Sequence, residues 1–316
     1  MNTRRNWQAR PAEPTRRWQV GAVRITKVSE SVLESALDEP SDEEGFLGQA
    51  SRKALLGIDW LRPDFITDEG AVLLAFHMLV VEAPGRTIVV DTCVGNGKLR
   101  PQHPFWDGQE LPFLTSLADA GVRVQDVDTV VCTHLHVDHV GWNTMLRNGR
   151  WVPTFPNARY LFGRREYEAC TREMENIGGT SHGLHPSVFI ADSVKPVFDT
   201  GLADLVEADH RICAEVRLIP THGHTPGHVS VLVESEGARA LITGDSIHHP
   251  CQLRHTGWTL AADADRDAAA ATRAALLDRH ADTPTLFIGT HWAGRSCGYV
   301  ERDGRSYRLN STAAAS

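Results

Sequence analysis

The 316-residue sequence contains no apolar run long enough to cross a bilayer. Its most apolar stretch, residues 71–83, is short and includes His77 and Glu82, so we predict no membrane-spanning helix. Basic residues are not in excess either, because 32 Lys and Arg stand against 40 Asp and Glu and give a net charge of −8. A nucleic-acid-binding surface needs a basic face, so we expect no nucleic-acid partner.

Cysteine is also scarce: the six residues are scattered at positions 93, 132, 170, 213, 251 and 297. In a chain of this length they indicate reduced thiols and not a disulfide framework. The arginine pairs at 4–5 and 16–17 are not followed by the apolar segment of an export signal. We therefore expect a cytoplasmic protein with a polar, disordered leader (1–17), one large domain (18–310) and a flexible tail (311–316).

What the sequence does contain is a dense string of metal-ligand residues, His134-Leu135-His136-Val137-Asp138-His139. It follows the apolar, β-branched segment 127–132, which predicts a buried strand. Side chains two residues apart lie on the same side of an extended chain, so His134 and His136 can converge on one metal. Asp138 and His139 lie further along the turn, where they can hold a second ion. A histidine-rich surface loop would be a sufficient explanation for one His-x-His pair alone.

Three downstream segments argue against a simple surface loop. Each is a short apolar strand pattern that runs into another ligand-type residue. The strand patterns are 216–221, 238–244 and 285–290, and the residues that follow them are the His222–His224 pair, Asp245 and His291. Ligands gathered from strand ends along one edge of a sheet are typical of sites in α/β folds.

These motifs, in this order, resemble the metallo-β-lactamase superfamily from about residue 20 to about residue 300. The resemblance implies an α/β fold of the four-layer αββα sandwich type. It also implies a ligand set, in which one metal takes three histidines, the other takes an aspartate and two histidines, and one aspartate bridges both. In this sequence these are His134, His136 and His224; Asp138, His139 and His291; and Asp245. Asp91 matches an acid that orients the ligand loop, whereas His222 and His228 are expected outside the ligand set.

Imidazole and carboxylate ligands without a thiolate suit zinc and tolerate iron, manganese or cobalt. We therefore expect two Zn²⁺ ions. Zinc lowers the pKa of bound water from about 15.7 to about 7, so a metal-bridging hydroxide could act as the nucleophile at neutral pH. The family likeness implies that Asp138 also carries a proton to the leaving group. Zinc β-lactamases that use a cysteine carry it where this chain has Asp245, which argues against antibiotic hydrolysis.

Within the superfamily, segments 133–142, 245–250 and 289–291 most resemble the N-acyl homoserine lactonase and methyl parathion hydrolase-like group. The resemblance implies a hydrolase that opens a small-molecule lactone or cleaves a carboxylic ester, and members of this group often form homodimers. Alternatives are a phosphotriesterase, or an iron-dependent dioxygenase or redox protein. His248 stands where lactonases often have a tyrosine. It is either a catalytic group that polarises the substrate or a residue that packs beside the site.

The remaining predictions concern secondary structure and the walls of the site. Residues 34–70 are either a surface connection or an active-site lid, and we favour the lid. Candidate wall residues are aromatic, although each can equally belong to the core. Most weight falls on the two that adjoin ligand turns, Trp142 and Trp292; the others are Phe105, Trp106 and Trp258. The patterns predict an edge strand at 18–30, a hairpin at 71–91 and helices at 110–120, 164–175 and 265–279.

Overall fold

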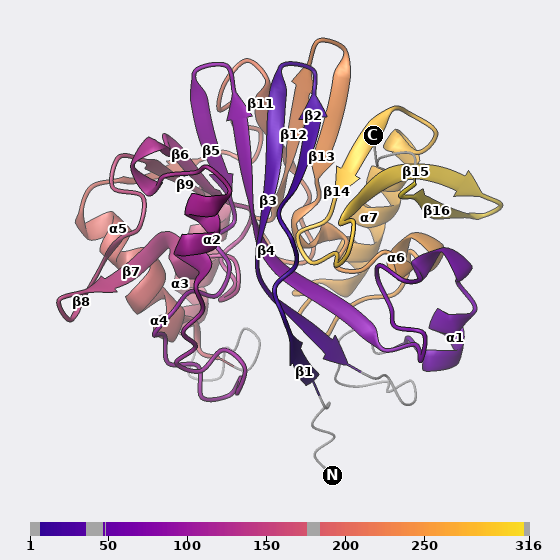
Figure 1. Ribbon diagram of the computed structural model, residues 1–316, viewed down its shortest axis with the longest axis horizontal. Helices are drawn as coiled ribbons and strands as arrows, with labels where there is room; N and C mark the ends of the chain where they lie inside the picture. Colours follow the sequence, from indigo (N-terminus) through magenta and orange to yellow (C-terminus); the bar gives the residue numbers. More distant parts are fainter. Residues whose placement is uncertain (1–6, 36–46, 48, 176–183, 313–316) are drawn as a thin grey trace.

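The computed structural model describes residues 7–35, 47, 49–175 and 184–312. Two large β-sheets form the centre of the molecule, and helices lie to either side of them (Figure 1). The first sheet has the strand order β1-β3-β4-β5-β6-β9-β10, with β2 also paired to β3, and the second runs from β11 to β16. This arrangement is the αββα sandwich that the sequence predicted.

The strands of the first sheet are β1 (Trp7–Arg10), β2 (Arg16–Val20), β3 (Val23–Ser35), β4 (Val72–Ala83), β5 (Arg86–Val90), β6 (Thr129–Cys132), β9 (Arg159–Gly163) and β10 (Ala203–Val206). Those of the second are β11 (Val216–Pro220), β12 (Val229–Ser235), β13 (Ala238–Ile242), β14 (Thr285–Ile288), β15 (Cys297–Asp303) and β16 (Ser306–Asn310). A separate hairpin joins β7 (Thr144–Arg147) to β8 (Arg150–Pro153).

Alternating side chains of the central strands build two cores, as the period of two in a strand requires. In β4, Leu79 and Val81 belong to the core between the sheets, whereas Met78 and Val80 belong to the core under the helices. The core between the sheets also takes side chains from the second sheet, such as Val231, which are likewise almost fully buried. Both faces of these strands are therefore covered, which explains why they read as continuous apolar runs.

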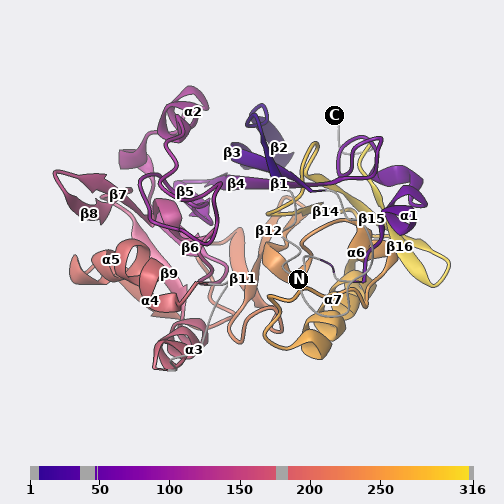
Figure 2. The ribbon, with the colours of Figure 1, turned by 90° about the horizontal axis from the view of Figure 1, so that it is seen from below.

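The helices are α1 (Arg52–Leu56), α2 (Phe113–Asp119), α3 (Arg164–Met174), α4 (Pro186–Phe189), α5 (Lys195–Asp199), α6 (Cys251–Arg254) and α7 (Arg266–His280). Helices α2–α5 lie on one side of the molecule, and α1, α6 and α7 lie on the other (Figures 1 and 2). The predicted hairpin and three helices are confirmed within a few residues at each end. Asp265 caps α7 by accepting a hydrogen bond from the Ala268 amide. Among the described residues, no helix has the length and apolar character that a bilayer crossing would need.

The prediction of a disordered leader over 1–17 is wrong from Trp7 onward, while residues 1–6 lie outside the described part. Strand β1 pairs antiparallel with β3, from Trp7 opposite Ser35 to Arg10 opposite Val32. The reason is that β3 is 13 residues long and β2 pairs only with its first five residues, so β1 pairs with the last four residues of the same strand. Glu13 fixes the connection by accepting hydrogen bonds from the Gly294 amide and from the buried Lys27.

The predicted edge strand at 18–30 is instead two strands, β2 and β3, and β3 lies inside the sheet. The turn between them contains Gly21, whose φ is +58°. A Cβ there would lie 2.2 Å from the Ser235 carbonyl oxygen of the second sheet, so only glycine fits this position. The alternating pattern correctly indicated strand but did not reveal the turn.

Within the predicted lid, residues 36–46 and 48 lie outside the described part of the chain. The described remainder packs beside the second sheet. Phe65 is fully buried, lies edge-on to Trp292 with ring centroids 6.2 Å apart, and accepts a hydrogen bond from His249 through its carbonyl oxygen. The lid stays a prediction, because 49–70 do not line the cavity and 36–46 and 48 lie outside the described part.

Candidate metal centre

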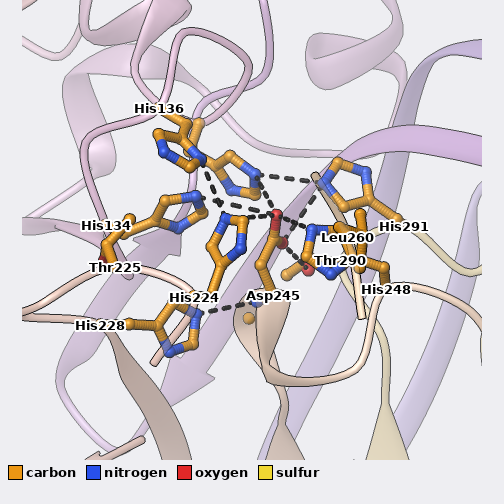
Figure 3. A network of polar contacts seen from close by, with 12 residues as sticks. His134, His136, His224, Thr225, His228, Asp245, His248, Leu260, Thr290 and His291 are labelled. Carbon is orange, nitrogen blue, oxygen red and sulfur yellow. Dashed lines mark hydrogen bonds and ion pairs between the residues drawn. The ribbon is translucent and has the colours of Figure 1, made fainter. Parts of the chain in front are cut away.

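All seven predicted ligands follow strands of the two sheets. His134, His136, Asp138 and His139 lie in the turn after β6, and His224 follows β11. Asp245 lies in a 3₁₀ turn (Gly244–Ser246) after β13, and His291 follows β14. Figure 3 shows the imidazoles converging on the Asp245 carboxylate from both sheets.

The structure brings the predicted ligands together in the predicted groups. His134, His136 and His224 offer ring nitrogens that lie within 4.8 Å of one another, and Asp138, His139 and His291 form a second group of the same kind. The Nε2 of His224 lies 2.9 Å from the Nδ1 of His136. In the second group, the Nε2 atoms of His139 and His291 are 3.1 Å apart. Each group therefore presents its donor atoms to one small volume.

Asp245 lies between the two groups, where the resemblance places the bridging ligand. Its Oδ2 is 3.5 Å from the His224 Nε2 and 3.7 Å from the His134 Nε2 of the first group. The same oxygen is 3.3 Å from the His139 Nε2, and Oδ1 is 3.3 Å from the His291 Nε2. One carboxylate thus contacts both halves of the cluster.

The chemistry of this cluster fits a pair of divalent cations. All seven side chains are at most 8 % exposed, and the His134 Nε2 is buried without a hydrogen-bond partner among the described residues. Buried imidazole nitrogens about 3 Å apart repel one another unless a proton or a cation lies between them. A set of five histidines and two aspartates without a thiolate matches the preference of zinc.

Charge in the cluster supports the same conclusion. Burial disfavours a proton on His139, but the carboxylates of Asp245, Asp91 and Asp138 outweigh burial and raise its pKa well above 6.5. Burial also disfavours the ionised form of Asp245, yet the surrounding imidazoles, His139 first, hold its pKa well below the usual value. The buried carboxylates therefore demand positive charge, and metal binding would release the protons that otherwise supply it.

Asp91 orients the ligand loop, as the resemblance implies. Its Oδ1 accepts a hydrogen bond from the Thr133 amide at 2.7 Å, and its Oδ2 lies 2.9 Å from the His139 Nδ1. Asp91 adopts a φ of +54°, a conformation that costs a non-glycine residue about 1 kcal/mol or more. Its hydrogen bonds, including one from the Thr133 hydroxyl, offset that cost and direct the His139 Nε2 toward the cluster.

Two further positioning carboxylates were not predicted. Asp263 lies 2.8 Å from the His224 Nδ1, so it fixes the ring whose Nε2 faces the first ligand group. The buried Glu166 of α3 accepts hydrogen bonds from the Leu135 amide, the Thr225 hydroxyl and the Gly227 amide, which joins the two histidine loops. Neither has a sequence motif, although Asp263 could have been suspected from its place before α7.

The other histidines have distinct positions. His228 accepts a hydrogen bond from the Asp245 amide through Nε2 at 2.8 Å, so it holds Asp245 in place as well as its own loop. His222 is only partly buried and lies outside the ligand groups of the described residues. His248 is buried at the site, and its Nε2 lies 2.8 Å from the Asp245 Oδ2.

A cavity of about 630 Å³ opens above the cluster. Its metal floor, as we name it, is formed by Asp138, Asp245, His248 and His291. Its apolar wall is formed by Trp7, Leu33, Leu74, Phe76, Leu260 and the continuous segment 101–106. Because the wall is mostly hydrophobic, the cavity is suited to a substrate with an apolar part next to a polar reacting group.

The emphasis on Trp142 and Trp292 as wall residues is wrong, and Trp258 does not line the cavity either. Trp142 is buried behind the ligand loop and donates a hydrogen bond to Glu30 at 2.7 Å. Trp292 is fully buried and donates to the Ile247 carbonyl oxygen at 3.0 Å. The prediction holds for Phe105 and Trp106, which do line the cavity.

A four-layer sandwich that collects histidine and aspartate side chains from strand ends of both sheets defines a class of metal-site α/β proteins. The chain belongs to the metallo-beta-lactamase superfamily, whose family model matches residues 77–291, more than half of the chain. The match spans every predicted metal ligand.

Among curated proteins, the chain is similar to N-acyl homoserine lactonases of bacilli. It is 26% identical over 168 residues to the one from Bacillus cereus, which covers 50% of this chain and 57% of that protein. It is 29% identical over 139 residues to one from a Bacillus species, which covers 42% of this chain and 46% of that protein. The matched region thus spans about half the length of these relatives.

Solved structures show the same fold along nearly the whole chain. The dizinc quorum-quenching lactonase AidC, in complex with a product, N-hexanoyl-L-homoserine, superposes with a TM-score of 0.72 at 19% identity. That match covers 94% of this chain and 96% of AidC. The hydrolase AbOPH, of the beta-lactamase superfamily, gives a TM-score of 0.74 at 22% identity and covers 93% and 96%.

Proposed function

We propose that this protein is a metal-dependent hydrolase that uses a dinuclear zinc site to open a lactone or cleave a carboxylic ester. The observation that carries the proposal is the buried group of seven ligand-type side chains at the base of an apolar cavity. The likeness to N-acyl homoserine lactonases supports lactones with an apolar acyl chain as the first substrate class to test.

In this proposal, each ligand group would hold one ion, and Asp245, which lies between the groups, would serve both. Two bound zinc ions would supply Lewis acidity and a water of lowered pKa, so no serine or cysteine nucleophile is needed. The chain's own contribution is to fix the ligands through Asp91, Asp263 and Glu166, and to surround the reacting group with a cavity that excludes bulk water. The wall binds the apolar part of the substrate.

Asp138 and His248 are the proposed catalytic groups, and both line the cavity. Burial lowers the pKa of His248 against the opposing effect of Asp245, which favours a neutral imidazole with one N–H. The His248 Nε2 faces the Asp245 Oδ2 at 2.8 Å, so this N–H would be available to substrate only when metal ions occupy that carboxylate. We assign it to the substrate carbonyl or the leaving oxygen. Asp138 would carry a proton to the leaving oxygen, and Asp138→Asn should then lower turnover even in protein that still holds both zinc ions.

The proposal is tested by measuring proton release when zinc-loaded protein is mixed with N-acyl homoserine lactones of increasing acyl length. Lactone opening yields a carboxylic acid, so activity appears as acid production that depends on metal. Asp245→Ala is the control for metal-independent hydrolysis. If zinc is confirmed in the protein and no lactone yields acid, the lactonase proposal is rejected, and aryl esters and phosphotriesters are the next substrates to test.

A further inference from the structure

Residues 98–108 form a closed loop, which we name the wall loop. Its tip, residues 101–106, is the longest continuous part of the apolar wall. The Lys98 carbonyl oxygen accepts a hydrogen bond from the Gly108 amide at 2.8 Å and closes the base of this loop. One step inside, the Arg100 amide donates to the Asp107 Oδ1 at 2.7 Å. The tip, residues 101–106, projects from this base and faces the cavity.

The base of the wall loop is fastened to a distant part of the chain by a buried ion cluster. Asp192 lies in a π-helical turn (Ile190–Val194) between α4 and α5. Its carboxylate pairs with the two terminal nitrogens of Arg100, Nη1 to Oδ2 at 2.8 Å and Nη2 to Oδ1 at 2.9 Å. The Lys98 Nζ lies 3.6 Å from the same carboxylate and donates to the Thr144 hydroxyl at 2.9 Å.

Both cations are completely buried, while the Asp192 side chain is 14 % exposed. Burial lowers the pKa of Lys98 to about 7 although Asp192 opposes that shift, which shows how strongly this environment disfavours a second charge. Arg100 keeps its charge at neutral pH, so without Asp192 its buried guanidinium must move toward water, because an unpaired buried charge is strongly destabilising. Lys98 can instead lose its proton, so the movement of Arg100 is what would open the base of the wall loop.

We propose that Asp192 is a positioning residue that determines substrate range, because its ion pairs with Arg100 and Lys98 hold the wall loop against the cavity. Asp192 does not line the cavity, and within the described part of the chain its hydrogen bonds and ion pairs reach Arg100, Lys98, Thr144 and Ser193, none of which belongs to the metal floor. Its effect on catalysis is therefore confined to binding of the apolar part of the substrate. The kinetic part of this inference rests on the proposed function, whereas the structural part does not.

The structural part is tested by limited trypsin digestion of the zinc-loaded protein with mass analysis of the fragments. Trypsin requires an accessible Lys or Arg side chain and does not cut before proline, so in the wall loop it can cut only after Lys98 and not at Arg100-Pro101. Lys98 is fully buried in the native protein, and Asp192→Asn should speed this cleavage by about tenfold or more as the loop base opens. The matched control is Asp204→Asn, which removes an exposed carboxylate paired with Arg159.

The kinetic part compares a short and a long acyl lactone, for instance butanoyl and decanoyl, in the same variants. With Asp192→Asn we expect KM for the decanoyl substrate to rise about tenfold, with kcat, zinc content and the butanoyl parameters changed less than about twofold. Asp192→Glu keeps the charge on a longer side chain and should show the same changes to a smaller degree. It also serves as the test variant if Asp192→Asn does not fold.

Unchanged cleavage after Lys98 and unchanged KM across the series would overturn the proposal. Loss of zinc, or an equal fall of kcat for both substrates, would also overturn it, because Asp192 would then act on the metal floor. If the native protein opens no lactone at all, the proposed function fails, and the digestion alone decides whether Asp192 holds the wall loop.

Discussion

The metal floor and the apolar wall of one cavity are built in opposite ways. The floor takes its side chains from turns after β6, β13 and β14, and buried hydrogen bonds hold these turns. Asp91 and Glu166 accept from the β6 turn, His228 accepts from the Asp245 amide, and the His291 Nδ1 lies 3.2 Å from the Ala75 carbonyl oxygen. The wall takes its side chains from the strands β1, β3 and β4, from a loop and from Leu260. In the proposed function, the chemistry would therefore be fixed at strand ends, and the substrate fit on the faces of paired strands and on a loop.

The difference explains what each region tolerates. A metal ligand must have one of a few side chains at one position, so substitution there removes the function. An apolar wall needs only shape and volume, so substitution there changes affinity by degrees. The contrast would be wrong if a floor substitution changed turnover only slightly, or if a wall substitution removed the metal.

The largest effect is expected from Asp245→Ala, which removes the carboxylate between the two ligand groups. We expect loss of bound zinc and a fall in kcat of about 10³-fold, equivalent to roughly 4 kcal/mol of transition-state stabilisation. Metal analysis and lactone turnover measure both. Asp209→Ala, at an exposed position, is the control, and a variant that retained two zinc ions and normal turnover would disprove the role of Asp245.

A smaller effect is expected from Asp263→Asn, which leaves the His224 Nδ1 without its charged partner. Loss of such a partner costs about 10–100-fold in metal affinity. Competition with a chelating dye measures this change. Asp265→Asn is a close control, because Asp265 caps α7 and asparagine caps helices equally well. Equal zinc affinity in both variants would mean that Asp263 does not support the first ligand group through His224.

On the wall, Trp7→Ala should raise KM for a long acyl lactone by about tenfold and leave zinc content and kcat unchanged. The reason is that Trp7 lines the cavity from β1 and is not a member of any ligand group. Trp258→Ala is the control, since Trp258 is another half-buried tryptophan and lies outside the cavity lining. Equal effects of the two substitutions would show that β1 contributes only general stability.

The smallest effect concerns pH. The raised pKa values of His139 and His291 mean that their protonation stabilises the zinc-free fold below pH 6.5, and that this contribution is lost as pH rises through the folded-state values. Zinc binding requires the same imidazoles unprotonated and strengthens with pH. The Tm difference between zinc-loaded and zinc-free protein should therefore widen above pH 6.5 by a few degrees, at about 2–4 °C per kcal/mol. A constant difference in scanning calorimetry would contradict this.

The fold and the floor were predictable because both leave local signals. Apolar strands ending in ligand residues carried the family resemblance, and the resemblance implied the sandwich and the seven ligands, whose role as ligands stays a prediction. The 71–91 hairpin and the α7 helix were found because their apolar patterns and capping residues are local. The leader failed because β1 forms only through pairing with β3, a contact between distant segments that polar composition does not reveal.

The wall was largely missed for a related reason. Trp142 and Trp292 adjoin ligand turns in sequence, but both point away from the cavity into buried hydrogen bonds. Sequence position gives no direction for a side chain in an irregular turn. Leu33, Leu74 and Trp7 reach the cavity only because β1, β3 and β4 are neighbours in one sheet, and ordinary apolar residues carry no signature of such a role.

The wall residues Trp7, Leu33, Leu74 and Phe76 all precede residue 77, where the family match begins, whereas every predicted metal ligand follows it. In the proposed function, the reaction chemistry and one part of the substrate-binding wall would thus be encoded in separate stretches of the chain, while the wall loop lies on the same side of residue 77 as the metal ligands. A chimera that takes residues 1–76 from a relative, joined within β4, should change substrate preference and keep the same reaction. Such an exchange must preserve the contact between the Ala75 carbonyl oxygen and the His291 Nδ1, because it joins the first quarter of the chain to the floor.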